Sequence, residues 1–373
     1  MITPNYSRLK LLFVTNGIHQ KSGTYTVLKN ICPKLLQNHE VTILTNQGNI
    51  DVECTKLIQL NTSFLPFPQY FYQSKLKNLV KSGFMDNFDI IHAFEYPLFA
   101  TDYLTINKKL FHPPLIISPH GSIHQFGSFP LNIMKKIHNK IMFNFFNNVS
   151  MLLAATNAEK IHLIKCGFAE EKIEVLSLGF GLPKVTRNPS KNNKILFVGR
   201  LTITKNIDLL VKAVSICKRK DFELIIVGHD FGMLKVLKKL VTELGLENRV
   251  IFKGRVSESE KLQLLSEATL FVHPSLEDIF SLSLLEAVGV GIPSIAFDIE
   301  ANPEIFENNC GFIVSKPNFE SLANSIDYLL NNEDERNKIS QNAILSIPEK
   351  YNWDNTVTTL EKYYLKVKNN GKL

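Results

Sequence analysis

The sequence predicts an α/β protein of two domains, each built around a parallel β-sheet. With 373 residues the chain is too long for one compact core and suits two domains of roughly 150–200 residues. Residues 10–45 read as strand, glycine loop, helix and strand, and a second unit of this kind starts at Lys194. Residues 179–193 are polar, aperiodic and contain Gly and Pro, which is typical of a linker. We therefore expect an N-terminal domain over residues 1–183 and a C-terminal domain over residues 194–350.

Apolar runs with helical or strand-like spacing place the elements of both domains. In the first half, strands are expected at residues 10–15, 41–45, 89–93, 115–118, 151–155 and 173–176, with helices at 24–37 and 129–147. In the second half, strands are expected from Lys194 and at 223–227, 249–252 and 270–272, with helices from Lys205 and from near Phe280. A last helix over about residues 352–368, after Tyr351, is expected to pack back on the first domain.

Two segments of the first half combine apolar and basic residues. Residues 64–72 are rich in Phe and Tyr and lead into three lysines, and the helix at 129–147 carries Ile133, Ile137, Ile141 and Phe145 along one face. Both patterns suit an anionic membrane surface. The alternative for each is burial: the aromatics dock on the sheet as a crossover loop, and the helix packs its apolar face on the sheet.

Composition restricts the classes of function. Hydrophobic content of 45% and charged content of 21% are ordinary for a globular protein. The five cysteines form no C-x-x-C pair, which argues against a zinc ribbon or a disulfide framework and favours a cytoplasmic protein. Neither a signal peptide nor an apolar stretch of membrane-spanning length is recognisable. The formal net charge of +7 lies entirely within residues 1–185, so we expect an anionic partner on that side, and no nucleic acid.

The stretch at residues 271–287 carries the most chemistry. An apolar strand breaks at His273-Pro274-Ser275, and a helix follows in which Leu282, Leu285 and Val288 are expected to face the core. The free N–H groups at the turn Ile279–Ser281 suit an anion. Asp278 and Glu286 lie beside this turn, where carboxylates would accept hydrogen bonds from sugar or ribose hydroxyls. The alternative is an ordinary capped helix with a solvated Glu.

Two cations in the second domain strengthen the anion hypothesis. Arg200 ends a strand and Lys205 is expected at the start of the next helix, so both are predicted to converge on one point. Two cations beside a helix N-terminus would neutralise the charge that develops on a diphosphate leaving group without a metal. The alternative is that both are solvated surface cations.

These motifs resemble those of glycosyltransferase family 4, a family of retaining GT-B enzymes. Residues 271–287 resemble its E-x7-E motif, here D-x7-E, because Asp278 stands at the first acidic position with Glu277 just before it. Residues 199–205 resemble its G-R-L-x-x-x-K signature. The resemblance covers nearly the whole chain and is most specific over residues 195–315. It implies two Rossmann-like domains that face each other across a cleft, with the nucleotide sugar held mostly by the second.

The resemblance also implies roles for single residues. His120, which follows an apolar strand, is similar to the family's active-site histidine, whereas His92 is the weaker candidate. Residues 252–256 resemble the segment that receives the nucleobase. The catalytic residues predicted in this way are His120, Arg200, Lys205 and Asp278, and the donor-binding residues are Gly17, Gly23, Gly199, Arg255, Glu277, Ile279, Phe280, Ser281, Leu282 and Glu286. Neither a metal nor a cofactor is expected beyond the nucleotide sugar itself.

The sequence therefore favours a retaining, metal-independent glycosyltransferase that moves a hexose-type sugar, with a UDP-sugar as the favoured donor. The expected acceptor is a glycan or lipid-linked molecule of cell-surface polysaccharide or lipopolysaccharide synthesis. The expected location is cytoplasmic, with peripheral contact to the inner face of the membrane. Two alternatives stay open: a nucleotide-sugar epimerase of the same fold, and an inactive nucleotide-sugar-binding partner subunit, for which Asp in place of Glu at position 278 is the hint.

Overall fold

The chain folds into two compact units. The computed structural model describes residues 8–15, 23–46, 51–60, 63–64, 71–72, 74–96, 98–120, 129–276, 278, 280–299, 301–315 and 317–370. The N-terminal unit consists of residues 1–180 and 351–373, and the C-terminal unit of residues 181–350. Among the described residues, no helix has the length and apolar character that a membrane crossing requires.

The N-terminal unit is built on a parallel sheet with the strand order β3-β2-β1-β6-β7-β8-β9. Its strands are β1 Lys10–Val14, β2 Glu40–Asn46, β3 Lys56–Leu60, β6 Ile90–Phe94, β7 Leu115–Ser118, β8 Met151–Ala154 and β9 Ile173–Val175. Its helices are α1 Gly23–Leu35, α2 Ser74–Lys81, α3 Phe99–Ile106, α4 Phe129–Phe146, α5 Asn157–Lys165 and α13 Trp353–Asn370. A small antiparallel pair joins β4 Ser63–Phe64 to β5 Phe71–Tyr72.

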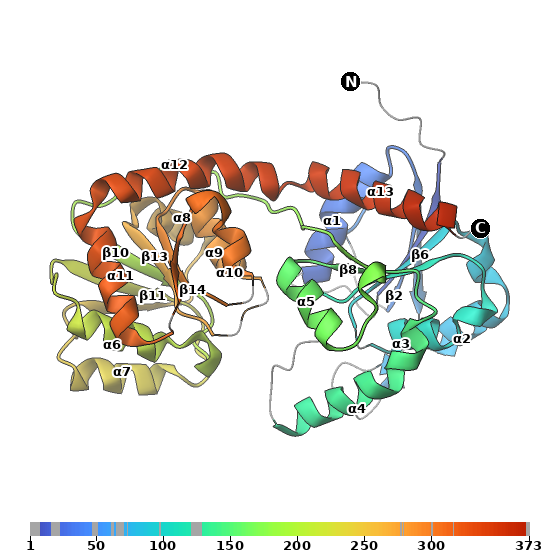
Figure 1. Cartoon of the computed structure of the whole chain (residues 1–373), viewed down its shortest axis with the longest axis horizontal. Helices are drawn as coiled ribbons and strands as arrows, with labels where there is room; N and C mark the ends of the chain where they lie inside the picture. Colours follow the sequence, from blue (N-terminus) through green and yellow to red (C-terminus); the bar gives the residue numbers. More distant parts are fainter. Residues whose placement is uncertain are drawn as a thin grey trace. The chain divides into compact units, whose positions relative to one another are not determined.

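The C-terminal unit has a parallel sheet with the equivalent strand order, β12-β11-β10-β13-β14-β15. Its strands are β10 Asn193–Val198, β11 Phe222–Val227, β12 Val250–Gly254, β13 Leu270–His273, β14 Ser294–Phe297 and β15 Phe312–Val314. Its helices are α6 Ile207–Ile216, α7 Leu234–Glu243, α8 Glu258–Glu267, α9 Leu282–Gly289, α10 Asn302–Ile305, α11 Phe319–Asn331 and α12 Glu333–Lys350. In both units helices cover both faces of the sheet (Figure 1).

Runs of consecutive apolar residues explain why these strands are parallel and central. All residues of β6, β7 and β13 are buried, so each strand is covered on both faces, as in doubly wound α/β proteins. In each sheet the first strand lies between the next strand of the chain and a later one, so the order reverses there. Ligands of open α/β sheets bind at the carboxyl ends of strands at such a switch point. The prediction of two Rossmann-like α/β domains is confirmed.

The last helix, α13, packs on the N-terminal unit against α1 (Figure 1). Leu360 and Tyr364 are fully buried in the core on that face of the sheet. Lys34 of α1 forms an ion pair of 2.5 Å with Asp354 at the start of α13, and the Tyr363 hydroxyl donates to the Val175 carbonyl over 2.9 Å. The chain thus returns to its first unit, as the sequence predicts.

Helix α4 packs on the core with a side other than the one that carries Ile137 and Ile141, so the packed alternative for that face is wrong. Met142 and Phe146 are buried, whereas the side chains of Ile137 and Ile141 are 56% and 60% exposed. Phe145 is half-buried against the same core. The helix is apolar on more than one side, so the regular spacing of its isoleucines was a poor guide to the packed face.

Two helices of the C-terminal unit start later than predicted. Lys205 ends a 3₁₀ turn, Ile203–Lys205, and Asn206 adopts a left-handed conformation (φ 46°) before α6 begins. Helix α9 begins at Leu282 rather than near Phe280, because Ser281 is its N-cap. Leu282 is therefore a first-turn residue with 53% of its surface exposed, and its prediction as a core residue is wrong.

Residues of the predicted linker are bound to the C-terminal unit. The guanidinium of Arg187 donates to the carbonyls of Gly291 and Ala268, each over 2.7 Å. The backbone N–H groups of Asn188 and Ser190 donate to the carbonyls of Ser266 and Glu267, each over 3.0 Å. These bonds explain why residues 181–192 belong to this unit although they form neither helix nor strand.

Candidate active site

The candidate site of the C-terminal unit lies at the carboxyl ends of β10 and β13. These strands are paired in parallel, so the loops that follow them leave the sheet at the same edge. The Thr204 carbonyl in the first loop accepts hydrogen bonds from the Ser275 hydroxyl (3.2 Å) and the Leu276 N–H (3.3 Å) in the second. Residues more than seventy positions apart are thereby held together at the switch point of the sheet.

Lys205, His273 and Asp278 form a polar cluster between these two loops. The Lys205 ammonium is paired with Asp278 Oδ2, and His273 Nε2 lies 3.1 Å from the same oxygen. The three side chains are 13%, 1% and 20% exposed, respectively. The structure therefore brings together two predicted catalytic residues and adds His273, which sequence reasoning had only placed at the end of a strand.

The electrostatics of the cluster favour an ionised Asp278 and a neutral His273. Burial raises the pKa of Asp278, but its contacts with His273 and Lys205 outweigh burial and lower the pKa to about 2. Burial lowers the pKa of His273, and the neighbouring carboxylate offsets this only in part. Within the described residues, His273 Nδ1 is buried without a hydrogen-bond partner. A polar side chain at the carboxyl end of a buried strand was the signal that could have identified it.

Arg200 has a different contact from Lys205. Its guanidinium is exposed and lies over the Phe231 ring, 5.8 Å from the centroid. The backbone beside it is tightly packed, because a Cβ on Gly228 would lie 1.7 Å from the Gly199 carbonyl oxygen. Only glycine is accommodated at position 228, so the strand ends can approach closely here. Within the described residues the two cations share no contact, so their convergence on one phosphate stays a prediction.

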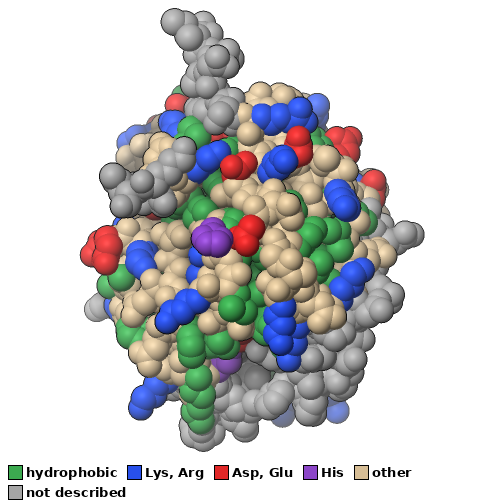
Figure 2. All heavy atoms as spheres, turned by 90° about the vertical axis from the view of Figure 1, so that its right-hand side faces the viewer, with side chains coloured by type: hydrophobic (Ala, Val, Ile, Leu, Met, Phe, Trp, Pro, Cys, Tyr) green, Lys and Arg blue, Asp and Glu red, His purple; other side chains and the backbone are tan. Residues whose placement is uncertain are grey.

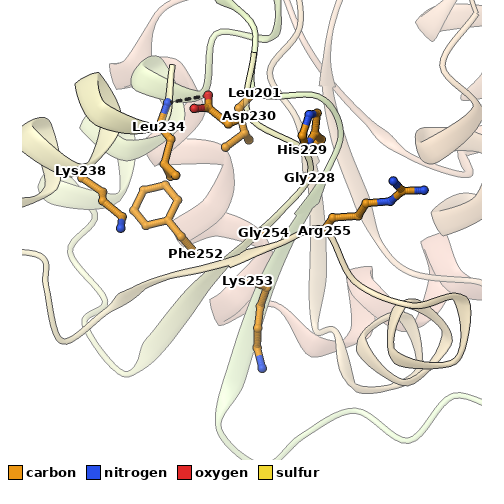
Figure 3. A pocket seen from close by; sticks show the side chains of 10 residues that line it. All are labelled: Leu201, Gly228, His229, Asp230, Leu234, Lys238, Phe252, Lys253, Gly254 and Arg255. Atoms are coloured by element: carbon orange, nitrogen blue, oxygen red, sulfur yellow. Dashed lines mark hydrogen bonds between the residues drawn. The ribbon is translucent and has the colours of Figure 1, made fainter. Parts of the chain in front are cut away.

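A cavity of about 330 Å³ lies at the carboxyl ends of β10, β11 and β12. Its walls include residues 252–255 of the predicted nucleobase segment, opposite residues 228–230 and Leu234. Figure 3 shows the Phe252 ring beside Leu234 and Lys238, with Arg255 extending away from them. A flat apolar wall with cations near it is suited to a planar, charged ligand.

The start of α7 beside this cavity already holds an anion. Asp230 Oδ1 accepts hydrogen bonds from the N–H groups of Gly232 (2.8 Å), Met233 (2.9 Å) and Leu234 (3.0 Å). These bonds, that of Leu234 foremost, lower the pKa of Asp230. The N-terminus of α7 is thus occupied by the protein's own carboxylate, whereas the cap that the described residues give α9 is the neutral Ser281 hydroxyl, which accepts from the Leu284 N–H.

The donor-binding residues predicted around α9 differ in burial and in hydrogen-bond partners. Phe280 is half-buried, Ser281 is buried as the N-cap, and Leu282 is exposed. Glu286, one turn further, accepts a hydrogen bond of 2.9 Å from Lys261 of α8, a partner that sequence reasoning missed. Glu277 and Ile279, both predicted to bind the donor, lie outside the described residues.

In the N-terminal unit, two acid–base side chains end adjacent strands in left-handed backbone. Glu95 follows β6 with φ 70° and His120 follows β7 with φ 51°. The Thr24 hydroxyl at the start of α1 donates to the Glu95 carboxylate, and the His120 ring stacks on Phe94 with centroids 5.9 Å apart. Burial lowers the pKa of His120 to about 4, and its Nε2 has no partner in the described part of the chain. Such strained positions cluster at functional sites, and Glu95 was missed by sequence reasoning.

The remaining predicted residues of this unit divide as follows. Both ring nitrogens of His92 are used inside the core: Nδ1 lies 2.9 Å from the Tyr364 hydroxyl and Nε2 lies 2.8 Å from the Ser118 hydroxyl. His92 is thus a structural residue. Gly23 is the first residue of α1, with open space where a Cβ would lie. Gly17 lies outside the described residues. Within the described ranges, no group of three His, Cys, Asp or Glu residues could hold a metal ion.

Solved structures that superpose on this chain include glycosyltransferases of the GT-B type. HepE of Anabaena, solved in complex with UDP, superposes with a TM-score of 0.77 at 21% sequence identity and covers 96% of this chain and 100% of its own. Two Rossmann-like units with polar clusters at the strand ends therefore define the chain as a protein of the GT-B glycosyltransferase fold.

Sequence comparison identifies the family. Residues 21–182 match the family model "Glycosyltransferase Family 4", and residues 182–346 match "Glycosyl transferases group 1". An uncharacterized glycosyltransferase of Methanocaldococcus jannaschii is 26% identical over 88% of this chain and 90% of its own. A GDP-mannose:cellobiosyl-diphosphopolyprenol alpha-mannosyltransferase of Xanthomonas oryzae is 23% identical over 72% of each chain. The chain belongs to glycosyltransferase family 4 and is a glycosyltransferase of glycan synthesis.

Proposed function

We propose that this enzyme moves a hexose-type sugar from a nucleotide sugar to a glycan or lipid-linked acceptor, with retention of anomeric configuration. The cluster of Lys205, His273 and Asp278 at the switch point of the C-terminal sheet carries the proposal. A cation and a carboxylate held together there suit a sugar diphosphate, in which phosphate charge and sugar hydroxyls are neighbours. The relatives' names support a nucleotide-sugar donor and a lipid-linked or polymeric acceptor.

The proposed mechanism assigns a role to each group. As the bond from the sugar's anomeric carbon to the diphosphate oxygen breaks, Arg200 and Lys205 stabilise the charge on the leaving phosphate. The acceptor hydroxyl forms the new bond on the same face of the sugar and gives its proton to that phosphate. Asp278 and His120 position the sugar, and Glu286 accepts from the ribose hydroxyls. Lys205 changes partners in this scheme, from Asp278 alone to Asp278 and phosphate. We propose that no metal takes part, so transfer persists in the presence of EDTA.

The donor is tested by a thermal-shift screen against UDP-, GDP- and ADP-sugars. We expect one base to stabilise the protein, and UDP is favoured, although the Xanthomonas relative uses GDP-mannose. Arg200→Ala should lose the shift, whereas Arg8→Ala, which removes an exposed arginine of the N-terminal unit, should keep it. Absence of any shift with the wild-type protein would contradict a nucleotide-sugar enzyme. Conversion of the sugar nucleotide without an acceptor would instead support the epimerase.

We also propose cytoplasmic location with peripheral contact to anionic membrane through the N-terminal unit. Ile137, Lys140 and Ile141 are exposed together on α4, which places apolar and basic side chains side by side. The face of the N-terminal unit in Figure 2 shows Lys and Arg side chains spread among apolar patches, with acidic side chains between them. Sedimentation with vesicles that contain anionic lipid tests this contact. Binding should fall in Ile137→Ser/Ile141→Ser, and equal binding to neutral vesicles would contradict the electrostatic part.

A further inference from the structure

We propose that Lys261 is a positioning residue for the donor ribose: it fixes the Glu286 carboxylate so that one oxygen faces the ribose hydroxyls. This inference rests on the proposed function, because it takes Glu286 to lie beside a nucleotide. It adds a residue of α8 that belongs to neither the D-x7-E motif nor the G-R-L-x-x-x-K signature.

Lys261 contacts two carboxylates, that of Glu258 on its own helix and that of Glu286 on α9. Its ammonium donates to Glu286 Oε1 over 2.9 Å and lies 3.0 Å from Glu258 Oε1. The Lys261 and Glu286 side chains are only 17% and 19% exposed, whereas Glu258 is 70% exposed. Burial lowers the pKa of Lys261, but the two carboxylates outweigh burial and raise it, so the ammonium stays charged.

The two carboxylate oxygens of Glu286 have different surroundings. Oε1 is occupied by Lys261, whereas Oε2 accepts no hydrogen bond from the described part of the chain. An ionised carboxylate is an acceptor only, so Oε2 is suited to hydroxyl donors. Without Lys261, the side chain would have to be ordered by the ligand itself, at a cost in affinity.

A purely structural role is the alternative, in which Lys261 only ties α8 to α9. The same helix offers a matched comparison, because Lys194 of β10 pairs with Glu267 of α8 at 2.6 Å. That pair is 22% and 28% exposed, close to the burial of the Lys261 pair. Loss of either lysine weakens the attachment of α8, but only the loss of Lys261 releases Glu286.

The experiment measures affinity for UDP and GDP and for their 2′-deoxy and 3′-deoxy forms by calorimetric titration. In the wild-type protein, the base that binds should show a ribose preference of roughly ten- to hundredfold over one deoxy form. We expect Lys261→Met to reduce this preference to within roughly threefold, as Glu286→Gln should do. Lys261→Arg should restore it, since the guanidinium also donates to a carboxylate. Lys194→Met should leave it at the wild-type value.

The possible results distinguish failure of the positioning role of Lys261 from failure of the proposed function. A preference that survives in Lys261→Met, or that falls equally in Lys194→Met, overturns the positioning role while nucleotide binding itself stands. A wild-type protein that binds UDP or GDP without any ribose preference also overturns it. If neither nucleotide binds the wild-type protein, the proposed function fails first.

Discussion

At the scale of single residues, backbone strain singles out two side chains of the N-terminal unit. Glu95 and His120 are the only residues other than Gly and Asn with positive φ in the described chain. Left-handed backbone costs a residue with a Cβ roughly 1–2 kcal/mol. Both residues carry groups able to bind an acceptor or a sugar, and both end adjacent paired strands. The strain is therefore located where a ligand-binding role is expected.

Comparison of Glu95→Gly with Glu95→Ala isolates this strain. Both variants lose the carboxylate, but glycine adopts φ 70° without steric cost, so the Gly variant should be more stable by about 0.5–1 kcal/mol. Urea unfolding measures the difference. At Glu53, which is exposed and has no positive φ, the order should reverse. If the Gly variant were the more stable one at both positions, backbone strain at Glu95 would be contradicted.

The Asp278 cluster predicts a dependence of stability on pH. The pKa of Asp278 is about 2 in the folded protein, below its unfolded value, so its contribution is present above about pH 4 and is lost as pH falls toward 2. Asp278→Asn should therefore be less stable than wild type by about 2 kcal/mol at pH 7, with the gap closing below pH 4. Calorimetry across this pH range measures it.

The control is Asp208→Asn, which breaks an exposed pair with Lys212 on α6. Exposed pairs contribute less than about 1 kcal/mol, so this variant should differ little from wild type at any pH. A gap between wild type and Asp278→Asn that stays constant from pH 7 to pH 2 would count against the lowered pKa.

At the scale of elements, helices α3 and α4 are joined by a partly buried His–Asp pair. His138 Nε2 of α4 lies 2.7 Å from Asp102 Oδ2 of α3, and His138 Nδ1 lies 3.2 Å from the Tyr96 hydroxyl. Burial lowers the pKa of His138, but the hydrogen bond and charge of Asp102 outweigh it and raise the pKa. The pair should therefore hold α4 most firmly when His138 is protonated.

The sign of the resulting pH effect follows from the raised pKa. The stabilisation is complete below the unfolded pKa of histidine and is lost as pH rises through the folded one. Hydrogen exchange of α4 amides, corrected for the intrinsic rate, should show more protection at pH 6 than at pH 8. His138→Gln should remove this difference, whereas His112→Gln, at a histidine that is 96% exposed, should keep it. A wild-type α4 with equal protection at both pH values would contradict the pair's role.

Strands and helices could be predicted from the sequence where a single apolar run corresponds to a single element. Strands β1, β7 and β13 follow from short buried runs, and a parallel sheet follows from their alternation with helices. Leu285 and Val288 of α9 are buried as predicted, but the exposure of Leu282 did not follow from the spacing, nor did the choice between an exposed and a packed side for Ile137 of α4. Helical spacing shows which residues share a side, but tertiary packing decides which side is covered.

Candidate-site residues were predictable where a residue lies within a motif. Asp278 and Lys205 are 73 positions apart and were both predicted, but their direct ion pair was not. Lys261 and His273 were missed as members of the site, because each acts on a predicted carboxylate from another element. Only the fold brings such partners within hydrogen-bond distance.

At the scale of the whole molecule, the chain returns to its first unit through α13. The Tyr364 hydroxyl lies in the core beside His92 Nδ1, at 2.9 Å, so the helix supplies a polar partner as well as apolar contacts. Tyr364→Phe should destabilise the N-terminal unit by about 1–3 kcal/mol, because it leaves a buried ring nitrogen unpaired.

The matched variant is Tyr363→Phe, which removes a half-buried hydroxyl bonded to the Val175 carbonyl. Its cost should be smaller, since water can replace the lost donor. Chemical unfolding followed by Trp353 fluorescence reports on this unit for both variants. Equal losses of unfolding free energy in the two variants would contradict the larger contribution expected from the contact with His92.

Hydrogen exchange of the full chain, with and without the nucleotide sugar that the thermal-shift screen selects, tests where the donor binds. We predict protection in the C-terminal unit at the loop after β10, along residues 252–256 and at the start of α9, the elements that carry the cluster and line the cavity. Protection confined to other surfaces, or none at saturating nucleotide sugar, would contradict the assignment of the donor site to these strand ends.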